Sequence, residues 1–374
     1  MAQHNLLVVG GGIAGMSLAI RMRERGWKVD LVESDPQWRV YGAGISITGP
    51  TFRAFNRLGV LDALKANGYP SEFGVRICIP TGQVVADIPT PPIEPGMPVQ
   101  GGIMRPVLHS ILSNRTRGAG TDVRLGVTMT EWSEDNSGQV TVKTSDGQQR
   151  TYSLVVVADG ALSKTRERLF PDAPKPKYTG QYCWRLVADR PAEIDRCHFY
   201  LAHPITAGLM PTSATQMYMF LLSPEPEKVR VAEGEQWQRL RQLMAPFGGI
   251  LGKLRDQLSA SSQINVRPLE AVLVPRPWHR GHVAMIGDAV HATTPHLASG
   301  AGIAVEDALV LSEYLASESD IGRALDAFEE RRWERCRMVV ENSVAIGDME
   351  LNHASPDKLK ALMAQSEQAL RADI

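Results

Sequence analysis

The chain opens with a short apolar run, followed by a glycine-rich stretch and a helical pattern. Residues 6–9 are Leu-Leu-Val-Val, and an unbroken apolar run of this length is typical of a strand buried on both faces of a parallel sheet. Residues 14–25 follow as an expected helix, with Gly26 placed to end it. A second strand is expected over residues 28–33. The pattern therefore predicts a strand–helix–strand unit at the start of the chain.

Apolar runs of the same kind return later in the chain. Residues 154–158 are Leu-Val-Val-Val-Ala and residues 283–286 are Val-Ala-Met-Ile, and a long helical pattern begins near residue 302. Two strand-rich segments interrupt this series: a hairpin over 75–88, and several strands between 178 and 268 with one helix at about 235–257. Pieces of one parallel sheet are thus spread over the whole chain, which favours two interleaved domains over two domains in series.

Composition and charge exclude several classes of partner. The chain has 40 basic and 41 acidic residues, so its formal net charge of −1 creates no field that favours nucleic acid or an anionic membrane. Its four cysteines show no C-x-x-C pair, its nine histidines show no H-x-x-x-H spacing, and we expect no metal site. The N-terminus lacks signal-peptide features and no apolar run reaches the length of a membrane span, so we expect a cytoplasmic protein without a membrane partner.

The strongest local motif is a G-x-G-x-x-G sequence between the first strand and the first helix. Gly10 would make the tight turn, Gly12 would let a pyrophosphate approach the backbone, and Gly15 would let helix and strand pack closely. The helix N-terminus offers free N–H groups to the phosphates. Glu33 ends the second strand, where its carboxylate can accept hydrogen bonds from ribose hydroxyls. The motif predicts a bound dinucleotide, and the expected binding residues in this region are Gly10, Gly12, Ile13, Ala14, Gly15, Glu33 and Ser34.

Two later segments specify the kind of dinucleotide. Residues 159–166 are Asp-Gly-Ala-Leu-Ser-Lys-Thr-Arg, and residues 287–291, Gly-Asp-Ala-Val-His, are followed by Pro-His-Leu-Ala-Ser-Gly-Ala-Gly at 295–302. Together with the glycine fingerprint, these segments resemble the three ordered motifs of the class A FAD-dependent aromatic hydroxylases, the family of the para-hydroxybenzoate, salicylate and 6-hydroxynicotinate hydroxylases. The resemblance covers about residues 5–345.

The resemblance implies an α/β fold in which a Rossmann FAD-binding domain of the glutathione-reductase type is interleaved with a mostly β-sheet substrate domain and followed by C-terminal helices. On this basis we expect an FAD-binding domain of residues 1–71, 99–177 and 269–345, a substrate domain of residues 72–98 and 178–268, and a helical tail of residues 346–374.

The resemblance also assigns roles in the flavin site. Arg105 would contact the flavin nucleotide, Asp288 would hydrogen-bond the ribityl chain, and Glu33 would bind the adenosine ribose. The amides of Gly300, Ala301 and Gly302, at a helix N-terminus, would stabilise the negative charge of reduced flavin. Asp159 and Arg166 resemble a pair associated with both FAD and NAD(P)H, and a purely structural ion pair is the alternative for Arg166. Met129 and Pro295 complete the expected cofactor-binding set.

Fewer residues point to the substrate. Residues 42–47 and 295–300 are similar to the pyridine-ring hydroxylases, although the family often has G-Q-G where this chain has Ala298-Ser299-Gly300. We expect Ser46, Met210 and His296 to line the substrate pocket. His203 and Tyr218 are the candidate catalytic bases, with a surface imidazole and a core aromatic ring as the alternative interpretations.

The reaction implied by the resemblance is the hydroxylation of a small aromatic or N-heteroaromatic ring by O2, through a flavin C4a-hydroperoxide. Since the chain has one dinucleotide fingerprint, we expect non-covalent FAD as the resident cofactor and NADH or NADPH as a transient co-substrate. An FAD-dependent epoxidase or reductase of the same fold, and a flavin-binding protein without turnover, remain alternatives. We expect a monomer or a homodimer.

Overall fold

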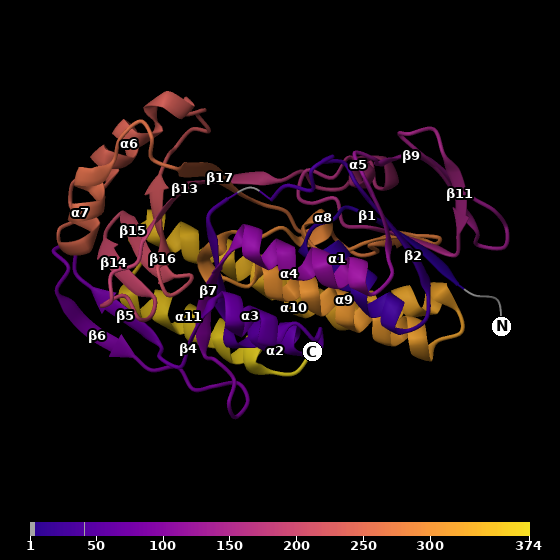
Figure 1. The fold of residues 1–374 in the computed structure, drawn as a ribbon, viewed down its shortest axis with the longest axis horizontal. Coiled ribbons are helices and arrows are strands. Elements are labelled where there is room, and N and C mark those ends of the chain that lie inside the picture. Colours follow the sequence, from indigo (N-terminus) through magenta and orange to yellow (C-terminus); the bar gives the residue numbers. More distant parts are fainter. Residues whose placement is uncertain (1–3, 41) are drawn as a thin grey trace.

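A six-stranded, mostly parallel sheet organises one half of the molecule (Figure 1). The computed structural model describes residues 4–40 and 42–374. The strand order of this sheet is β18 (His279–Arg280), β19 (Val283–Met285), β12 (Leu154–Val157), β1 (Asn5–Val9), β2 (Lys28–Glu33) and β8 (Asp122–Leu125). β1 pairs in parallel with both β12 and β2, so its apolar side chains are covered on both faces, as the sequence pattern predicts.

A seven-stranded sheet forms the other half. Its strand order is β17 (Ile264–Ala271), β13 (Lys177–Asp189), β16 (Gln216–Pro224), β15 (Ile205–Pro211), β14 (His198–Ala202), β5 (Val75–Cys78) and β6 (Val84–Ile88). β5 and β6 form the antiparallel hairpin that the sequence predicts, and β5 pairs in parallel with β14. Strands that lie about a hundred residues apart in the chain therefore share one sheet.

Two three-stranded sheets complete the β structure. They contain β3 (Gly44–Thr48), β7 (Gln100–Met104) and β4 (Tyr69–Ser71) in one, and β11 (Gln149–Tyr152), β10 (Val140–Thr144) and β9 (Met129–Glu134) in the other. The first contains residues 44–47 of the 42–47 segment that the sequence likens to the pyridine-ring hydroxylases, and the pairing of Gly44 with Met104 places them beside the N-terminus of the helix that begins at Arg105.

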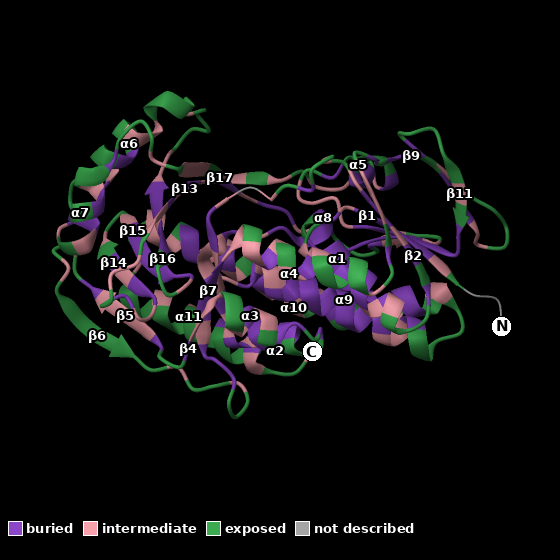
Figure 2. Ribbon diagram, viewed as in Figure 1, coloured by how far each residue is buried: buried purple, intermediate pink, exposed green. Residues whose placement is uncertain are grey.

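The helices lie mainly between the two large sheets, where Figure 1 shows α1, α4, α9 and α10 along the middle of the molecule. Figure 2 shows α9 buried over most of its length. The helices are α1 (Ile13–Glu24), α2 (Gly49–Arg57), α3 (Leu61–Asn67), α4 (Arg105–Gly118), α5 (Lys164–Leu169), α6 (Gln236–Leu243), α7 (Gly249–Gln257), α8 (Asp288–His291), α9 (Gly300–Ser317), α10 (Ile321–Leu351) and α11 (Pro356–Arg371).

Two details differ from the sequence-based expectations. The single helix expected at 235–257 is wrong, because α6 ends before Pro246, whose ring cannot continue a helix, and α7 starts after Gly248. The expected start of the C-terminal tail at residue 346 falls inside α10, which is one continuous helix. The α/β architecture with C-terminal helices is confirmed.

The hydrophobic core is divided between the two large sheets. The larger cluster of buried side chains joins the parallel sheet to α1, α9 and α10, and a second cluster packs α6 and α7 against the seven-stranded sheet. Over the residues that the structure describes, no helix combines the length and apolar character needed to cross a membrane.

Candidate active site

The glycine fingerprint forms the turn between β1 and α1, and its three glycines have different surroundings. Gly10 has a φ of +107°, and a Cβ there would overlap the carbonyl oxygen of Ala158 at the end of β12. A Cβ at Gly15 would overlap the carbonyl oxygen of Gly10. At Gly12, by contrast, no atom lies within 4 Å of the Cβ position, and this open side faces a cavity.

Glu33 is held against this turn by hydrogen bonds. Its Oε2 accepts the N–H of Gly11 at 2.8 Å, and its Oε1 accepts the N–H of Asp35 at 2.8 Å and the hydroxyl of Ser34 at 3.1 Å. Trp38 donates its indole N–H to the carbonyl oxygen of Gly11 at 2.8 Å. The carboxylate therefore has a fixed position beside the fingerprint, and its contact with a ribose remains a prediction.

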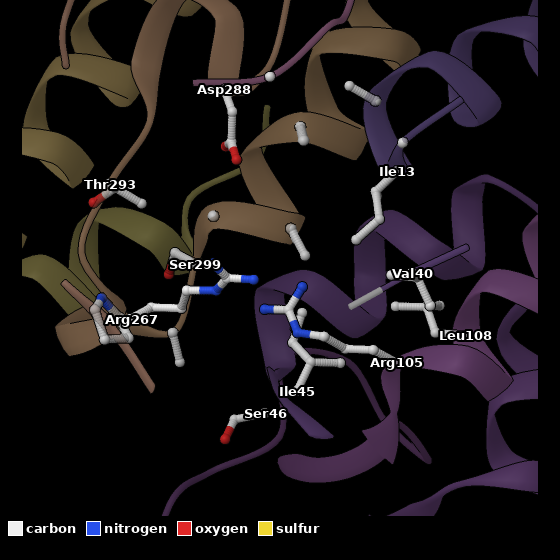
Figure 3. Close-up of a pocket in the computed structure, with 18 of the residues that line it drawn as sticks. Ile13, Val40, Ile45, Ser46, Arg105, Leu108, Arg267, Asp288, Thr293 and Ser299 are labelled. Atoms are coloured by element: carbon white, nitrogen blue, oxygen red, sulfur yellow. The ribbon is translucent and has the colours of Figure 1, made fainter. Parts of the chain in front are cut away.

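A cavity of about 490 Å³ extends from the fingerprint to the seven-stranded sheet (Figure 3). Its volume lies in the usual range for small-molecule and cofactor sites. The wall on the parallel-sheet side contains many of the residues that the sequence predicts to bind a dinucleotide. These are Gly12, Ile13, Ala14, Arg105, Asp288, Pro295, Gly300 and Ala301.

Asp288 points into this cavity from the first residue of α8 (Figure 3). The preceding Gly287 has a φ of +63°, which a residue with a side chain rarely adopts. The carboxylate is accessible from within the cavity but is surrounded by protein, so burial raises the pKa of Asp288, while the charges of His291 and Arg105 act in the opposite direction. An acceptor in this position is suited to hydroxyl donors of a ligand.

The N-terminus of α9 forms another part of the wall. Gly300 and Ala301 line the cavity, so their N–H groups and the positive end of the helix dipole face it. Ala298 adopts the left-handed conformation, with a φ of 47°. Gly302 has another role, because a Cβ there would lie 2.5 Å from Oγ1 of Thr51. It allows α9 to pack against α2.

Asp159 and Arg166 do not form the structural ion pair considered from the sequence. Arg166 donates to the carbonyl oxygens of Ala289 and Ala161, each at 2.8 Å, and so connects α5 by hydrogen bonds to α8 and to the loop that precedes α5. Asp159 accepts from the hydroxyl of Thr165 at 3.1 Å, and its Oδ1 is buried without a partner among the described residues. Such an unsatisfied acceptor is consistent with a missing ligand donor.

On the opposite side of the cavity, Tyr218 of β16 meets Ser46 of β3. Their hydroxyl oxygens lie 2.6 Å apart, and both residues line the cavity. A Cβ at Gly44 would overlap the Tyr218 ring, which explains the glycine at position 44. Burial raises the pKa of Tyr218 to about 12, so the phenol is protonated at neutral pH.

Four other expected site residues do not line the cavity formed by residues 4–40 and 42–374. The His203 ring lies in the turn between β14 and β15, 6.0 Å from that of His353. The His296 ring faces α10, with Nδ1 2.9 Å from Oγ1 of Thr294 and Nε2 3.5 Å from Oε2 of Glu350. Met129 packs in the larger core, and Met210 lies against Gly102.

Among the cavity residues that were not anticipated from the sequence are two arginines, Arg185 of β13 and Arg267 of β17. Both belong to the seven-stranded sheet, and Figure 3 shows Arg267 directed toward Arg105 across the cavity. The one local signal for Arg185 is its position as a charged residue within the otherwise apolar strand segment 182–188. Nothing local distinguishes Arg267.

One cluster of potential metal ligands lies outside the cavity. Ligand atoms of His291, Asp307 and Cys336 lie within 4.8 Å of one another. The Arg332 guanidinium, however, donates to Asp307 at 2.9 Å and carries a positive charge at this place. The cluster is accounted for as a buried ion-pair network.

The cavity fits FAD in several respects. The N-termini of α1 at Gly12 and of α9 at Gly300 face it, and each can bind an anionic group. The open space at Gly12 allows close approach of a pyrophosphate, Arg105 supplies a cation, and Asp288 supplies an acceptor. FAD would therefore be held by Gly12, Arg105, Asp288 and the amides of α9.

Comparisons with known proteins agree with this geometry. The family described as "FAD binding domain" matches residues 3–343. Aurachin C monooxygenase/isomerase from Stigmatella aurantiaca is 30% identical over 355 residues, which cover 92% of this chain and 89% of that protein. An HpxO variant from Klebsiella pneumoniae complexed with FAD has a TM-score of 0.83 at 25% identity, covering 99% of this chain and 95% of that one.

A further solved structure is the tetrameric form of 2-methyl-3-hydroxypyridine-5-carboxylic acid oxygenase. It has a TM-score of 0.75 at 25% identity, and the match covers 98% of this chain and 96% of that one. The family match spans most of the chain, and these relatives are similar over almost their whole length. The chain therefore belongs to the FAD binding domain family, in which it is a flavoprotein monooxygenase similar to the class A aromatic hydroxylases.

Proposed function

We propose that this monooxygenase hydroxylates a small aromatic or N-heteroaromatic ring of the phenol or hydroxypyridine type. NADH or NADPH would bind transiently and supply the two electrons. The balanced reaction converts the ring C–H, O2, NAD(P)H and one proton into the ring C–OH, NAD(P)+ and water. Bound FAD would accept the hydride and activate the oxygen.

The observation that carries this proposal is the extent of the cavity. It is lined on one side by Gly12, Asp288 and Gly300, and on the other side by Tyr218 and Arg185 of the seven-stranded sheet. A ring bound beside Tyr218 would therefore face the flavin from the sheet side. The names of two relatives support this substrate class, because one acts on a hydroxypyridine carboxylic acid and another is an aurachin C monooxygenase/isomerase.

The chain's own residues would bind the ring and exclude water. Gly44 packs against the Tyr218 ring, and Ser46 holds the Tyr218 hydroxyl at 2.6 Å, so this wall is rigid. With a pKa raised to about 12, Tyr218 would act as a neutral hydrogen-bonding group that orients a ring hydroxyl. The amides at the N-terminus of α9 would stabilise negative charge on the opposite side.

Labelled oxygen tests the proposal directly. FAD-loaded protein is incubated with NADH or NADPH, 18O2 and a panel of phenols and hydroxypyridines, and the products are analysed by mass spectrometry. We expect one ring compound to gain a single labelled oxygen atom. The control is Gly12→Val, which should lose FAD and yield no labelled product. Recovery of all reduced oxygen as hydrogen peroxide across the panel would contradict the proposal.

A further inference from the structure

The turn that leads into α9 has two faces. Residues 293–295 and 298–299 line the cavity, and α9 begins directly afterwards at Gly300. The His296 side chain points the other way, toward α10, and is only 2% exposed. The turn therefore has a front that faces the cavity and a back that is occupied by His296.

At the back of the turn, His296 meets side chains from two other elements. Its Nδ1 lies 2.9 Å from Oγ1 of Thr294 within the turn, and its Nε2 lies 3.5 Å from Oε2 of Glu350 on α10. The same oxygen of Glu350 accepts a hydrogen bond from Nε2 of Gln181 on β13 at 3.4 Å. We call His296, Glu350 and Gln181 the back cluster. It joins the turn to α10 and to the seven-stranded sheet.

The back cluster is buried, and its hydrogen bonding is incomplete. Gln181 is fully buried, and the Glu350 side chain is 14% exposed. Within the part of the chain that the structure describes, Nε2 of His296 and Oε1 of Gln181 have no hydrogen-bond partner. Polar groups in this state destabilise a folded protein, and apolar side chains can fill the same space with less destabilisation. Packing therefore explains the cluster poorly, whereas a role in fixing the position of the turn explains it well.

The helix α10 makes room for the back cluster at Gly347. A Cβ there would lie 2.9 Å from both Oε1 of Gln181 and Cε1 of His296. Glycine in the middle of a helix is unfavourable, because it loses more conformational freedom on folding than alanine does. The glycine at this position is explained by the two side chains that it admits.

The front of the turn determines where the first N–H groups of α9 point. Ala298 has a φ of 47°, in the left-handed region that disfavours a residue with a side chain, so neighbouring contacts have to hold this conformation. Gly300 and Ala301 follow within three residues and present their N–H groups to the cavity. A shift of the turn would move both groups, and the stabilisation that such donors give to a negative charge depends on their position.

We propose that His296 is a positioning residue for the bound flavin. Through Glu350 and Gln181 it holds the turn in a fixed place relative to the seven-stranded sheet, and so directs the first N–H groups of α9 at the negative charge that FAD gains on reduction. The back cluster therefore sets how much more tightly the protein binds reduced than oxidised FAD. This inference depends on bound FAD and is independent of the substrate class proposed above.

The midpoint potential of bound FAD tests the proposal without turnover. It is measured by anaerobic reductive titration against a reference dye, with no ring substrate present. Glu350→Ala and His296→Ala should each reduce the preference for reduced FAD about tenfold, the size of effect that a helix N-terminus exerts on an anion, and so lower the potential by about 30 mV. Glu350→Gln keeps an acceptor oxygen for Gln181 and should lower the potential less.

The direction of the shift separates positioning from a simple effect of charge. Removal of a carboxylate near the flavin would by itself favour the anionic reduced form, and would raise the potential equally in Glu350→Ala and Glu350→Gln. Gly347→Ala changes no charge. Its methyl group would displace His296 or Gln181, so the potential should fall in this variant too, in a helix that alanine favours.

The matched control is Glu341→Ala, which removes a carboxylate from an exposed position of the same helix. It should keep the potential of the parent protein, and every variant should bind oxidised FAD with similar affinity by flavin fluorescence. Unchanged potentials in Glu350→Ala and Gly347→Ala would overturn the proposal, as would a rise of equal size in both Glu350 variants. Because no oxygen or ring compound is present, a lowered potential in variants of a protein that hydroxylates no ring would contradict the proposed function and leave this inference standing.

Discussion

The imidazole of His291 and the carboxylate of Asp307 form a fully buried pair, with Nε2 2.6 Å from Oδ2. The same oxygen of Asp307 accepts the N–H of Gly287 at 2.9 Å, and its other oxygen accepts from Arg332 at 2.9 Å. Gly287 directly precedes Asp288. The pair therefore fixes the turn that directs Asp288 into the cavity, and it connects α9 and α10 to this turn.

This pair should give the protein a distinctive pH dependence. The attraction of Asp307 outweighs burial and raises the pKa of His291 well above its usual value, whereas the pKa of Asp307 is lowered by His291 and Arg332 against the effect of burial. Since the unfolded-state pKa of histidine is about 6.5, the stabilisation from His291 is complete below that pH and is lost as pH rises through the folded-state pKa. The stabilisation from Asp307 is lost in acid. We expect the melting temperature to fall on the alkaline side of neutrality.

The variant His291→Gln tests this assignment. Removing one partner of a buried pair costs about 3–5 kcal/mol, so the melting temperature at pH 7 should fall and its alkaline decline should become shallower. Thermal unfolding by circular dichroism from pH 5 to pH 10 measures both effects. His353→Gln, at an exposed position, is the matched control. A His291→Gln profile parallel to that of the parent protein would show that His291 does not carry this pH dependence.

The fingerprint glycines provide a matched pair of variants. Because no atom lies within 4 Å of the Cβ position of Gly12, Gly12→Val should fold with a nearly unchanged melting temperature as apoprotein. Its side chain would fill the space for the pyrophosphate, so FAD should be absent from the purified protein. Gly15→Val should instead be unstable, because its side chain would overlap the backbone of Gly10. Full FAD content in a folded Gly12→Val protein would contradict the placement of the cofactor.

Asp288→Ala should weaken FAD binding by about 1.5–3 kcal/mol, the range for a hydrogen bond to a charged group. The reason is that Asp288 is the acceptor that points into the cavity from α8. Quenching of flavin fluorescence on titration of the apoprotein measures the Kd. Asp172→Ala, in an exposed turn, should leave the Kd unchanged. An unaltered Kd for Asp288→Ala would mean that FAD does not contact this carboxylate.

Tyr218→Phe distinguishes an orienting role from a role as the base. With its pKa raised to about 12, Tyr218 keeps its proton between pH 6 and 9. Loss of the hydroxyl should therefore raise KM, because the ring substrate loses a hydrogen-bonding partner, while the pH profile of kcat/KM keeps its shape over this range. Disappearance of an ionisation from that profile would instead identify Tyr218 as the catalytic base.

Local sequence predicted the cofactor side of the site better than the substrate side. Gly10, Gly12 and Gly15 lie within one turn and the start of one helix, so their spacing alone predicts the tight packing at Gly10 and Gly15 and the open side at Gly12. Asp288 lies three residues after the end of the buried strand β19. The placement of Arg267, however, depends on the pairing of β17 with β13, which begins almost ninety residues earlier in the chain. Such long-range pairing leaves no local pattern.

His296 shows that long-range contacts also decide the position of a side chain within a recognised motif. The turn Pro295–Leu297 directs its ring toward α10, where a Cβ on Gly347 would lie 2.9 Å from the His296 ring. The absence of a side chain at Gly347 makes room for the imidazole. Because this space is created by a helix some fifty residues later, the position of His296 beside the flavin loop did not reveal which way its ring points.

Coupling between ring binding and flavin reduction separates a hydroxylase from an oxidase. The chain has one dinucleotide fingerprint, at Gly10–Gly15, so the nicotinamide would have to reach the flavin through a transient site. If the flavin were reduced without a ring substrate present, NAD(P)H would be consumed to form hydrogen peroxide and no ring would be hydroxylated. We therefore expect slow anaerobic reduction of FAD in the free protein and a strong acceleration when an aromatic ligand binds, because the ligand favours the arrangement that the nicotinamide can reach. Stopped-flow absorbance measures both rates, and a ligand that binds without accelerating reduction serves as the internal control. Equal rates with every phenol and hydroxypyridine tested would leave the protein an oxidase, since oxygen consumption would then be independent of any ring substrate.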